Sequence, residues 1–392
     1  MSESPQHPSR LGRFVSTTAG TEIVRAYVPP PLPPDPPVAL AGIVNLIEKA
    51  NRALGRLDGI TSILPAPPLF LFMYVRKEAL LSSQIEGTQS SLSDLLLFEN
   101  DELPLVPIDD VQEVSNYVAA MNYGLKRLNE GFPLSLRLIR EIHDILLRKG
   151  RGSGKQPGEF RRSQNWIGGT RPGNALFVPP PPDEMHKALD NFERFLHDQK
   201  LPMLIRAALA HVQFESIHPF LDGNGRLGRL LITFMLCAEG ALKQPMLYLS
   251  LYFKQRRMQY YELLQGVRDH GDWETWIEFF LTGVTETANE AVDTARQLLT
   301  LFEEDRERIR SVGRPAASML RVHELLQRRP IIGILPASRE LKVTHPTVMK
   351  ALDHLQKLEI VREVTGRRRG KLFSYARYMS ILARDTEAIP NR

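Results

Sequence analysis

The segment with the densest set of reactive side chains reads IHPFLDGNGRLGRL over residues 217 to 230. His218 has an unperturbed pKa of about 6.5, so it can take a proton from a hydroxyl group near pH 7. Asp222 offers a hard carboxylate oxygen of the kind that Mg²⁺ binds beside phosphates. These two residues predict general-base chemistry on a phosphate-containing ligand.

A Gly-Asn-Gly turn, Gly223 to Gly225, precedes a helix that the apolar pattern predicts over residues 224–239. The first N–H groups of a helix have no partner within the helix, and they bind anions. Arg226 and Arg229 are three residues apart, so they share one helix face, and arginine binds phosphate oxygens in a bidentate manner. We therefore expect this helix to begin at a phosphate site that includes Gly223, Asn224, Gly225, Arg226 and Arg229.

Each of these residues alone also fits an ordinary helix start with a hydrogen-bonded histidine. Two cations in a first turn are unfavourable for the helix itself, however, and such local conflicts mark functional sites. The combination at these spacings favours the phosphate site.

This segment resembles the Fic family signature, His-Pro-Phe-x-Asp/Glu-Gly-Asn-Gly-Arg-x-x-Arg, at every position from His218 to Arg229. The resemblance implies transfer of AMP from ATP to a Ser, Thr or Tyr hydroxyl of a protein, the enzyme itself included. It implies that His218 is the general base, Asp222 the Mg²⁺ ligand, residues 223–225 the anion hole, and Arg226 and Arg229 the ligands of the β- and γ-phosphates.

Residues 68–86 are predicted to form a helix that ends at Gly87. Glu86 then lies in the last turn, where a negative charge is disfavoured. Ser82 to Gly87 resembles the family's autoinhibitory motif, Ser/Thr-x-x-x-Glu-Gly/Asn. The resemblance implies that Glu86 pairs with Arg229 and blocks the γ-phosphate, with Ser82 on the same face. A solvated glutamate at a helix end is the alternative.

Residues 158–182 lose the helical pattern and read as short β-prone runs separated by Gly and Pro-Gly-Asn, which predicts a hairpin. It resembles the family's flap, which aligns the target segment by strand addition. Ile167, Gly168, Gly169 and Thr170 are therefore candidates for docking of the nucleotide or the target. A plain surface loop is the alternative.

Tyr260 and Tyr261 lie in a predicted helix over 248–269. They are similar to a tyrosine pair that family members keep near the nucleoside. Two aromatic residues that merely pack between helices would give the same pattern, and the two interpretations stay open.

Composition predicts an ordinary globular protein of more than one domain, with 392 residues and 43% hydrophobic residues. Cys237 is the single cysteine, which excludes an intrachain disulfide and fits a reducing compartment. The first residues lack an apolar leader, and the longest apolar runs are too short to span a bilayer. We expect a cytoplasmic protein without membrane association.

The predicted fold is an all-α Fic core with a small β-hairpin flap, followed by a C-terminal winged helix-turn-helix domain of α+β type. The core is inferred from apolar residues that recur with helical spacing between residues 39 and 312. The expected divisions are an extended Pro-rich lead-in (1–38), an N-terminal helical region with the inhibitory helix (39–109), the catalytic core (110–285), a connecting helix (286–312) and the winged-helix domain (313–392).

The C-terminal division holds sixteen Lys and Arg and seven Asp and Glu, a net charge of +9, so residues 1–312 carry −4 of the total of +5. Predicted helices over 316–327, 337–341 and 347–358, then a hairpin over 360–375, resemble a winged helix. A basic excess of this kind favours an anionic partner. The DNA-binding candidates are Thr344, Thr347 and Lys350 at the start of the recognition helix, and Arg367, Arg368, Arg369 and Lys371 at the wing tip. A domain that binds only protein is the alternative.

Other functions fit parts of this pattern. The enzyme could remove AMP from a modified protein, with Glu86 positioning water, or use another phosphate donor. A DNA-binding regulator that uses the Fic core as a nucleotide sensor is the non-enzyme alternative. Because relatives form homodimers, the resemblance also implies a homodimer.

Overall fold

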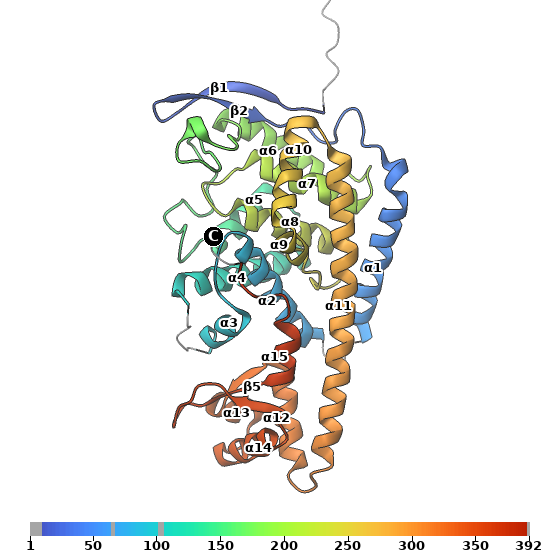
Figure 1. Ribbon diagram of the computed structural model, residues 1–392, viewed down its shortest axis with the longest axis vertical. Helices are drawn as coiled ribbons and strands as arrows, with labels where there is room; N and C mark the ends of the chain where they lie inside the picture. Colours follow the sequence, from blue (N-terminus) through green and yellow to red (C-terminus); the bar gives the residue numbers. More distant parts are fainter. Residues whose placement is uncertain (1–9, 64–66, 101–105, 390–392) are drawn as a thin grey trace, which may run out of the picture.

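The computed structural model describes residues 10–63, 67–100 and 106–389. A helical body occupies the upper part of the molecule, and a smaller C-terminal unit lies below it, joined by the long helix α11 (Figure 1). The helices of the body are α1 (Val44–Ile63), α2 (Pro67–Ile85), α3 (Leu92–Phe98), α4 (Ile108–Asn129), α5 (Leu136–Leu146), α6 (Pro182–Leu196), α7 (Met203–Ile217), α8 (Asn224–Ala238), α9 (Ser250–Gln255), α10 (Arg257–His270) and α11 (Trp273–Arg310). Short 3₁₀ turns span Leu40–Ile43 and Pro172–Asn174.

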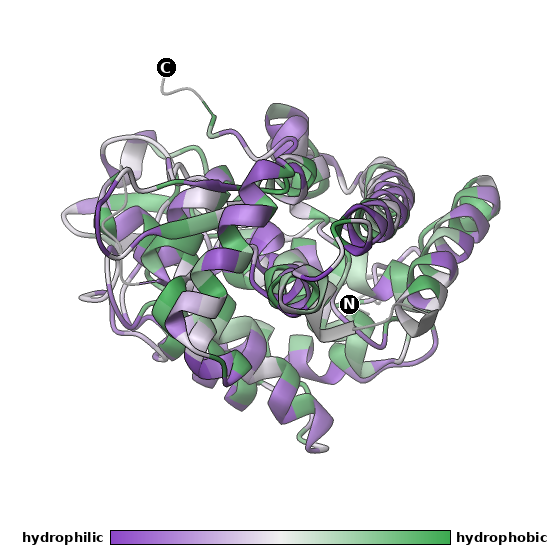
Figure 2. Ribbon diagram, turned by 90° about the horizontal axis from the view of Figure 1, so that it is seen from below, coloured by the Kyte–Doolittle hydropathy of each residue, from purple (hydrophilic) through white to green (hydrophobic). Residues whose placement is uncertain are grey.

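Helices α7 and α8 form the centre of the body. Every residue of α7 from Leu204 to Ile217 is buried, and α8 packs along it. Helices α4 and α5 cover one side of α8, and α11 packs on α7 and, over a long stretch, on α1. Hydrophobic and hydrophilic residues alternate along the helix ribbons in Figure 2, as expected for amphipathic helices around a shared core. In the described residues, no helix is both long and apolar enough to cross a membrane.

An antiparallel hairpin, β1 (Arg13–Ala19) and β2 (Glu22–Val28), lies at the top of the body (Figure 1). The prediction of an extended lead-in over 1–38 is therefore incomplete, because it followed the prolines of residues 28–38. The missed signal is a pair of alternating runs separated by two residues, with Gly20 at a φ of +63°.

Helix α11 is 38 residues long, about 57 Å at 1.5 Å per residue, and it runs without a break through the predicted boundary at residues 285 and 286. The predicted connecting helix is thus the second half of one element. Buried residues continue along it at Leu298, Leu301, Asp305 and Ile309, so this half also packs on neighbouring elements. A further correction concerns 248–269, which is two helices interrupted at Arg256.

The C-terminal unit consists of α12 (Ala316–Arg328), β3 (Ile331–Gly333), α13 (Ile334–Leu341), α14 (His345–Lys357), β4 (Val361–Glu363), β5 (Leu372–Tyr375) and α15 (Ala376–Leu382). Its three strands form an antiparallel sheet in the order β3-β5-β4. Strand β3 escaped sequence analysis because three residues are too few for an alternating pattern. The Tyr375 hydroxyl donates to the buried Asp305 carboxylate (2.8 Å) and lies 3.1 Å from His323 Nε2, which fixes the unit on α11.

Three buried histidines predict that acid destabilises the protein. Burial lowers the pKa of His143 and His323 to about 4 and that of His211 to about 3. The unfolded chain, with histidine near 6.5, binds more protons, so stability is complete above pH 6.5 and falls as the pH drops toward 4. Between pH 7 and pH 5 each histidine costs up to about 2 kcal/mol. Burial raises the pKa of Glu78 and Glu215 to about 7, and these two groups act in the opposite direction over the same pH range. The histidine contribution is therefore isolated by a variant: wild type should lose more stability between pH 7 and pH 5 than His323→Gln. An equal loss in the two proteins would contradict this assignment.

Candidate active site

The segment singled out by sequence is the loop between α7 and α8. His218 caps the C-terminal end of α7 in a left-handed conformation (φ 49°, ψ 61°), and its N–H donates to the Phe214 carbonyl (2.9 Å). Non-glycine residues seldom adopt this conformation, and where they do the surroundings must hold them. Gly223, also left-handed at φ 76°, precedes α8. The loop therefore places His218 and the start of α8 side by side on two buried helices.

The Asn224 side chain holds this loop internally. Its Oδ1 accepts from the Phe220 N–H (2.9 Å), and its Nδ2 donates to the Phe220 carbonyl (2.8 Å). The side chain of Asn224 thus stabilises the loop, and its backbone N–H is the group that the predicted anion hole would use.

His143 of α5 supports the same loop and was not predicted. Its ring stacks on Phe220 with 3.7 Å between centroids. Its Nδ1 accepts from the Gly158 N–H (2.9 Å), so the proton is on Nε2, which donates to the Asp222 carbonyl (3.0 Å). His143 thus ties the loop to the start of the segment 158–182.

Arg161 holds His218 from the other side and was also missed. Its side chain is fully buried, and its Nε donates to the His218 carbonyl (2.9 Å). Its other nitrogens donate to carbonyls of Ser163, Pro180 and Ile217. One guanidinium group therefore fixes both the backbone of His218 and the segment beside it.

A cavity of about 490 Å³ opens beside this loop. It brings together His218, Asp222 and the start of α8 with side chains from the turn after α2, from α4 and from the 158–182 segment. Its lining comprises Glu86, Glu113, Arg151, Asn165, Trp166, Ile167, Gly168, His218, Leu221, Asp222, Gly223, Asn224, Gly225 and Arg226.

The start of α8 faces this cavity. The first hydrogen bond of the helix runs from the Leu227 N–H to the Gly223 carbonyl (3.0 Å). The N–H groups of residues 224–226 precede that bond, and all three residues line the cavity. They supply the donors of an anion site.

The Glu86 carboxylate lies beside the start of α8, against Gly225. A Cβ atom placed on Gly225 would lie 2.3 Å from Glu86 Oε1, so the carboxylate presses against this glycine. Arg229 Nη2 donates to the same oxygen (2.6 Å), and Arg229 also donates to the Ser82 hydroxyl (2.8 Å) and carbonyl (3.0 Å). The pairing that the resemblance implied is therefore present, with Ser82 as its second anchor.

The charge of Glu86 is maintained by its surroundings. Burial alone would raise its pKa, but Arg229, Arg226 and His218 outweigh burial, and the pKa lies below the ordinary value. A carboxylate with a lowered pKa stays ionised at pH values below its ordinary pKa, and it loses its contribution only in stronger acid. At neutral pH Glu86 is thus an anion beside the start of α8.

Arg226 is held by a carboxylate that sequence analysis missed. Glu113 of α4 lies 3.0 Å from Arg226 Nη1 through one oxygen and 2.5 Å from Arg151 Nε through the other. The side chains of Glu113 and Arg226 are only 3% and 4% exposed, whereas Arg151 is 52% exposed. Glu113 therefore positions two cations at the wall of the cavity.

His218 is uncharged at neutral pH. Burial, with Arg161 and Arg268 nearby, lowers its pKa to about 3, although Glu86 acts in the opposite direction. A neutral imidazole is the form that accepts a proton. His218 is therefore in its proton-accepting form throughout the physiological range.

Family comparisons agree with this geometry. Residues 44–126 match the model described as Fic/DOC family N-terminal, and residues 133–236 match the model described as Fic/DOC family. The chain carries both domains of the Fic/DOC family. The first match contains α2 with Glu86, and the second contains the loop from His218 to Arg229.

Curated relatives of the Fic domain are named protein adenylyltransferase Fic. The protein from Drosophila yakuba is 34% identical over 175 residues, which is 44% of this chain and 32% of the relative. The protein from Aedes aegypti is 35% identical over 176 residues, with 44% and 32% covered. The match thus spans about a third of the length of these relatives.

Two solved structures share the Fic fold. A Fic family protein from Desulfovibrio desulfuricans G20 has a TM-score of 0.57 at 21% identity, and the match covers 87% of this chain and 97% of that one. A Fic domain containing signaling protein from Bacteroides thetaiotaomicron has a TM-score of 0.50 at 19% identity, with 63% and 95% covered. At this identity the likeness concerns the fold alone.

The segment beside the Fic loop is less regular than predicted. Only one bridge, between Ile167 and Phe177, joins its two sides within 158–182, so the expected hairpin is reduced to a single pair. The glycines and the 3₁₀ turn at Pro172–Asn174 interrupt a longer ladder. Ile167 and Gly168 line the cavity, whereas Gly169 and Thr170 are exposed outside its lining.

The two tyrosines of α10 have different environments. Tyr260 is buried, its ring stacks on Phe253, and its hydroxyl lies 2.8 Å from His211 Nε2. Of the two open interpretations, packing between helices therefore fits Tyr260, because its ring and its hydroxyl both contact buried residues. Tyr261 is 39% exposed, so Tyr261 alone stays a candidate for the nucleoside site.

The seven C-terminal candidates lie away from the cavity of the Fic domain. Thr344 precedes α14, Thr347 and Lys350 lie in its first turns, and Thr344 and Thr347 bond to each other through their hydroxyls (2.8 Å). The loop between β4 and β5 carries Arg367, Arg368 and Arg369, all exposed, and the half-buried Lys371.

Proposed function

We propose that this chain transfers AMP from ATP to a Ser, Thr or Tyr hydroxyl of a protein, and that Glu86 inhibits the reaction in cis. The observation that carries this proposal is the Glu86 carboxylate in front of Gly225 with Arg229 bound to it. The Glu86 carboxylate occupies the position that we expect the γ-phosphate of ATP to take in the active state.

The reaction follows from the side chains around the cavity. The target hydroxyl gives its proton to His218 as its oxygen bonds to the α-phosphorus. The bond between that phosphorus and the oxygen that bridges to the β-phosphate breaks, and pyrophosphate leaves. Negative charge grows on the phosphates, and the N–H groups of residues 224–226 with Arg226 and Arg229 stabilise it.

Asp222 is suited to hold Mg²⁺ in this site. Its side chain is 41% exposed, and its Oδ1 accepts from the Gly223 N–H (2.6 Å), with Oδ2 left over. Mg²⁺ in nucleotide sites takes one or two carboxylates, and phosphate and water oxygens complete its shell. When bound, the metal would neutralise charge on the phosphates.

Inhibition by Glu86 follows from charge and space. The Glu86 carboxylate binds the guanidinium of Arg229 and lies at the start of α8, and the γ-phosphate would bind these same two groups. Two anions cannot share these donors in a site removed from water. ATP in the inhibited state therefore binds weakly or with its α-phosphorus out of line.

The target protein is proposed to dock beside Ile167 and Gly168. Both residues line the cavity, and a segment added along this edge would use backbone hydrogen bonds. Such docking places a hydroxyl near His218 and reads little sequence, so the enzyme itself is also a substrate.

The proposal is tested by incubating the full chain with Mg²⁺ and ATP labelled in the α-phosphate, then separating protein from nucleotide. Label on the protein, stronger in Glu86→Gly, supports AMP transfer. Absence of label from both proteins, with candidate targets present, rejects it.

Glu113 provides a sharper test of the phosphate site. Glu113→Gln keeps the shape but removes the charge that positions Arg226 and Arg151. In a Glu86→Gly background we expect kcat/KM for ATP to fall by about tenfold to a hundredfold, because a charged hydrogen bond is worth roughly 1.5–3 kcal/mol. Glu141→Gln, which alters an arginine-bound glutamate of α5 outside the cavity, should have no effect. A Glu113→Gln variant with unchanged kinetics would contradict the positioning role.

Removal of AMP is the second candidate, and one observation favours it. Glu86 and His218 line the same cavity, and the Glu86 side chain is 35% exposed, so it can hold a water molecule beside His218. Glu86→Gln should then abolish release of AMP from a modified protein while it increases transfer. Release that survives this change excludes the reversal.

The C-terminal unit is proposed to be a winged helix that contacts DNA. The observations behind it are α14 with its exposed first turns and the basic loop between β4 and β5. Replacing Arg367, Arg368 and Arg369 by Ala should weaken binding to duplex DNA and reduce the salt slope by about 3, since each phosphate contact contributes about 0.9. Absence of salt-dependent binding by the intact chain removes this proposal.

A regulator that uses the Fic core only as a nucleotide sensor is the non-enzyme candidate. It would bind ATP and DNA equally well after His218→Ala and would never label protein. Homodimer formation and a cytoplasmic location stay predictions.

A further inference from the structure

The position of Glu86 depends on the turn that follows α2. The N–H groups of Glu86 and Thr88 donate to the Ser83 carbonyl (3.0 and 3.3 Å), and the Gly87 N–H donates to the Gln84 carbonyl (3.1 Å). Gly87 has a φ of +100°, which suits glycine. Movement of residues 84–89 would therefore move the inhibitory carboxylate.

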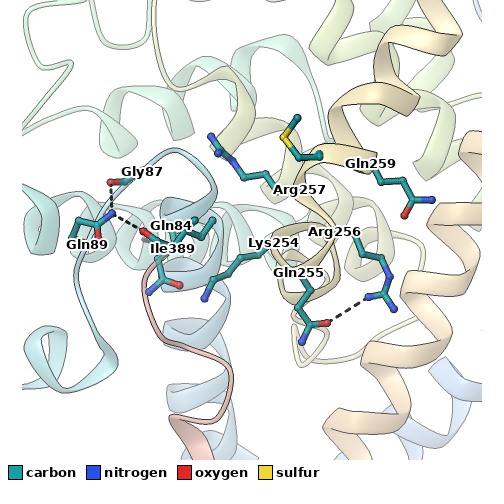
Figure 3. Close-up of a pocket in the computed structure, with 10 residues that line it drawn as sticks. Gln84, Gly87, Gln89, Lys254, Gln255, Arg256, Arg257, Gln259 and Ile389 are labelled. Carbon is teal, nitrogen blue, oxygen red and sulfur yellow. Dashed lines mark hydrogen bonds between the residues drawn. The ribbon is translucent and has the colours of Figure 1, made fainter. Parts of the chain in front are cut away.

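Residues 383–389, which follow α15, lie along this turn. Gln84 Nε2 donates to the carbonyls of Thr386 (2.8 Å) and Ser90 (3.0 Å), and Gln84 is buried. Gln89 Nε2 donates to the carbonyls of Ile389 (3.3 Å) and Gly87 (3.2 Å). Figure 3 shows the C-terminal segment beside Gln84 and Gln89, close to Gly87.

Lys254 of α9 holds the same segment from the opposite side (Figure 3). Its ammonium group donates to the carbonyls of Asp385 (3.1 Å) and Glu387. Burial lowers its pKa to about 8, although Glu387 and Asp385 act in the opposite direction. Nearby, Arg257 Nε donates to the carbonyl of Ile85, the last residue of α2 (3.1 Å). The turn, the segment and α9–α10 together surround a cavity of about 840 Å³.

The C-terminal unit controls the path of this segment. Helix α15 leads directly into it and packs on α11, and α12 packs on α2 itself. The buried contact between Tyr375 and Asp305 fixes the end of β5, immediately before α15. A displacement of the C-terminal unit would thus reach the end of the inhibitory helix through contacts that are already in place.

We propose that residues 383–389 form a latch that holds the turn after α2 and keeps Glu86 in the anion site. This inference rests on the proposed inhibitory function of Glu86. The hydrogen bonds of the latch run from the side chains of Gln84, Gln89 and Lys254 to backbone carbonyls of residues 385–389. The latch therefore depends on the backbone path of this segment and hardly on the side chains of the segment. A ligand that binds the C-terminal unit and displaces the segment would release inhibition.

The experiment removes donors in the full chain. Lys254→Met takes away the ammonium group that binds Asp385 and Glu387, and Gln84→Glu replaces the amide donor with an oxygen that repels the Thr386 carbonyl. Lys243→Met is the control, since Lys243 is an exposed lysine paired with Asp58. The measurements are label transfer from α-labelled ATP and hydrogen–deuterium exchange of residues 83–90.

We expect Lys254→Met and Gln84→Glu to raise transfer by about tenfold, the effect of losing one or two hydrogen bonds, and to speed exchange in residues 83–90. Lys243→Met should do neither. Added to Glu86→Gly, the latch changes should give no further rise, because the carboxylate that they release is gone.

The outcomes separate the latch from the proposed function. If Glu86→Gly raises transfer but both latch variants leave transfer and exchange unchanged, the latch is wrong and the function stands. If the latch variants increase transfer equally with and without Glu86, the latch is also wrong, because the variants would then act on catalysis directly. If Glu86→Gly itself raises nothing, the proposed function fails, and the regulatory role of the latch fails with it.

Discussion

Replacing Glu86 by Gly is expected to raise the rate of AMP transfer to protein by about tenfold to a hundredfold. The change leaves the buried Arg229 without the partly exposed carboxylate that binds it, and a hydrogen bond to a charged group is worth roughly 1.5–3 kcal/mol. Part of that free energy becomes available to the γ-phosphate, and each 1.36 kcal/mol is about tenfold in rate. Initial rates with α-labelled ATP and Mg²⁺ measure the effect.

Two control variants isolate the charge of Glu86. Glu99→Gly breaks an ion pair with Arg76 that lies outside the lining of the cavity and should leave the rate unchanged. Glu86→Gln keeps the volume of the side chain and should give an intermediate increase. Equal rates in wild type and Glu86→Gly, with ATP well above its KM, would remove the inhibitory role.

ATP should stabilise the Glu86→Gly variant against unfolding more than it stabilises the wild type. Without Glu86 the buried Arg229 lacks its nearest carboxylate, so Glu86→Gly alone should unfold at a lower temperature than wild type. Bound ATP stabilises the folded state in proportion to its affinity. Thermal unfolding should therefore show a larger upward shift with Mg²⁺ and ATP in Glu86→Gly than in wild type.

Replacing His218 by Ala in the Glu86→Gly background is expected to lower kcat by about 10²- to 10⁴-fold, the usual contribution of a general base. KM for ATP should change little, since the imidazole serves the hydroxyl and the arginines serve the phosphates. His197→Ala, an exposed histidine at the end of α6, is the matched control.

The pH dependence gives a second signature of His218. Because its pKa is lowered to about 3, the imidazole stays unprotonated, and kcat in Glu86→Gly should be flat from pH 8 to pH 6. A fall with an apparent pKa near 6.5 would indicate an ordinary, solvated histidine. Full activity of His218→Ala would exclude it as the base.

The parts of the site that sequence analysis found are those that lie close together along the chain. The loop from His218 to Arg229 carries its chemistry in consecutive residues, and its helix begins at Asn224 as expected. The contact of Glu86 with Arg229 joins positions 143 residues apart; only the family resemblance pointed to it.

The parts that sequence analysis missed act from other elements without a local signal. Glu113 is one acidic residue on an amphipathic helix, and only the packing of α4 on α8 brings it to Arg226. Arg161 and His143 likewise contact backbone atoms of the loop. Tyr260 is the opposite case: its sequence position suggested a site residue, but tertiary packing buries it in the core.

The most direct test of AMP transfer compares two labels in one reaction. Glu86→Gly is incubated with Mg²⁺ and ATP labelled either in the α-phosphate or in the γ-phosphate, and the protein is isolated and counted. Transfer of AMP predicts label on protein from the α-phosphate alone, abolished by His218→Ala. Label from the γ-phosphate, or α-label that persists without His218, would contradict it.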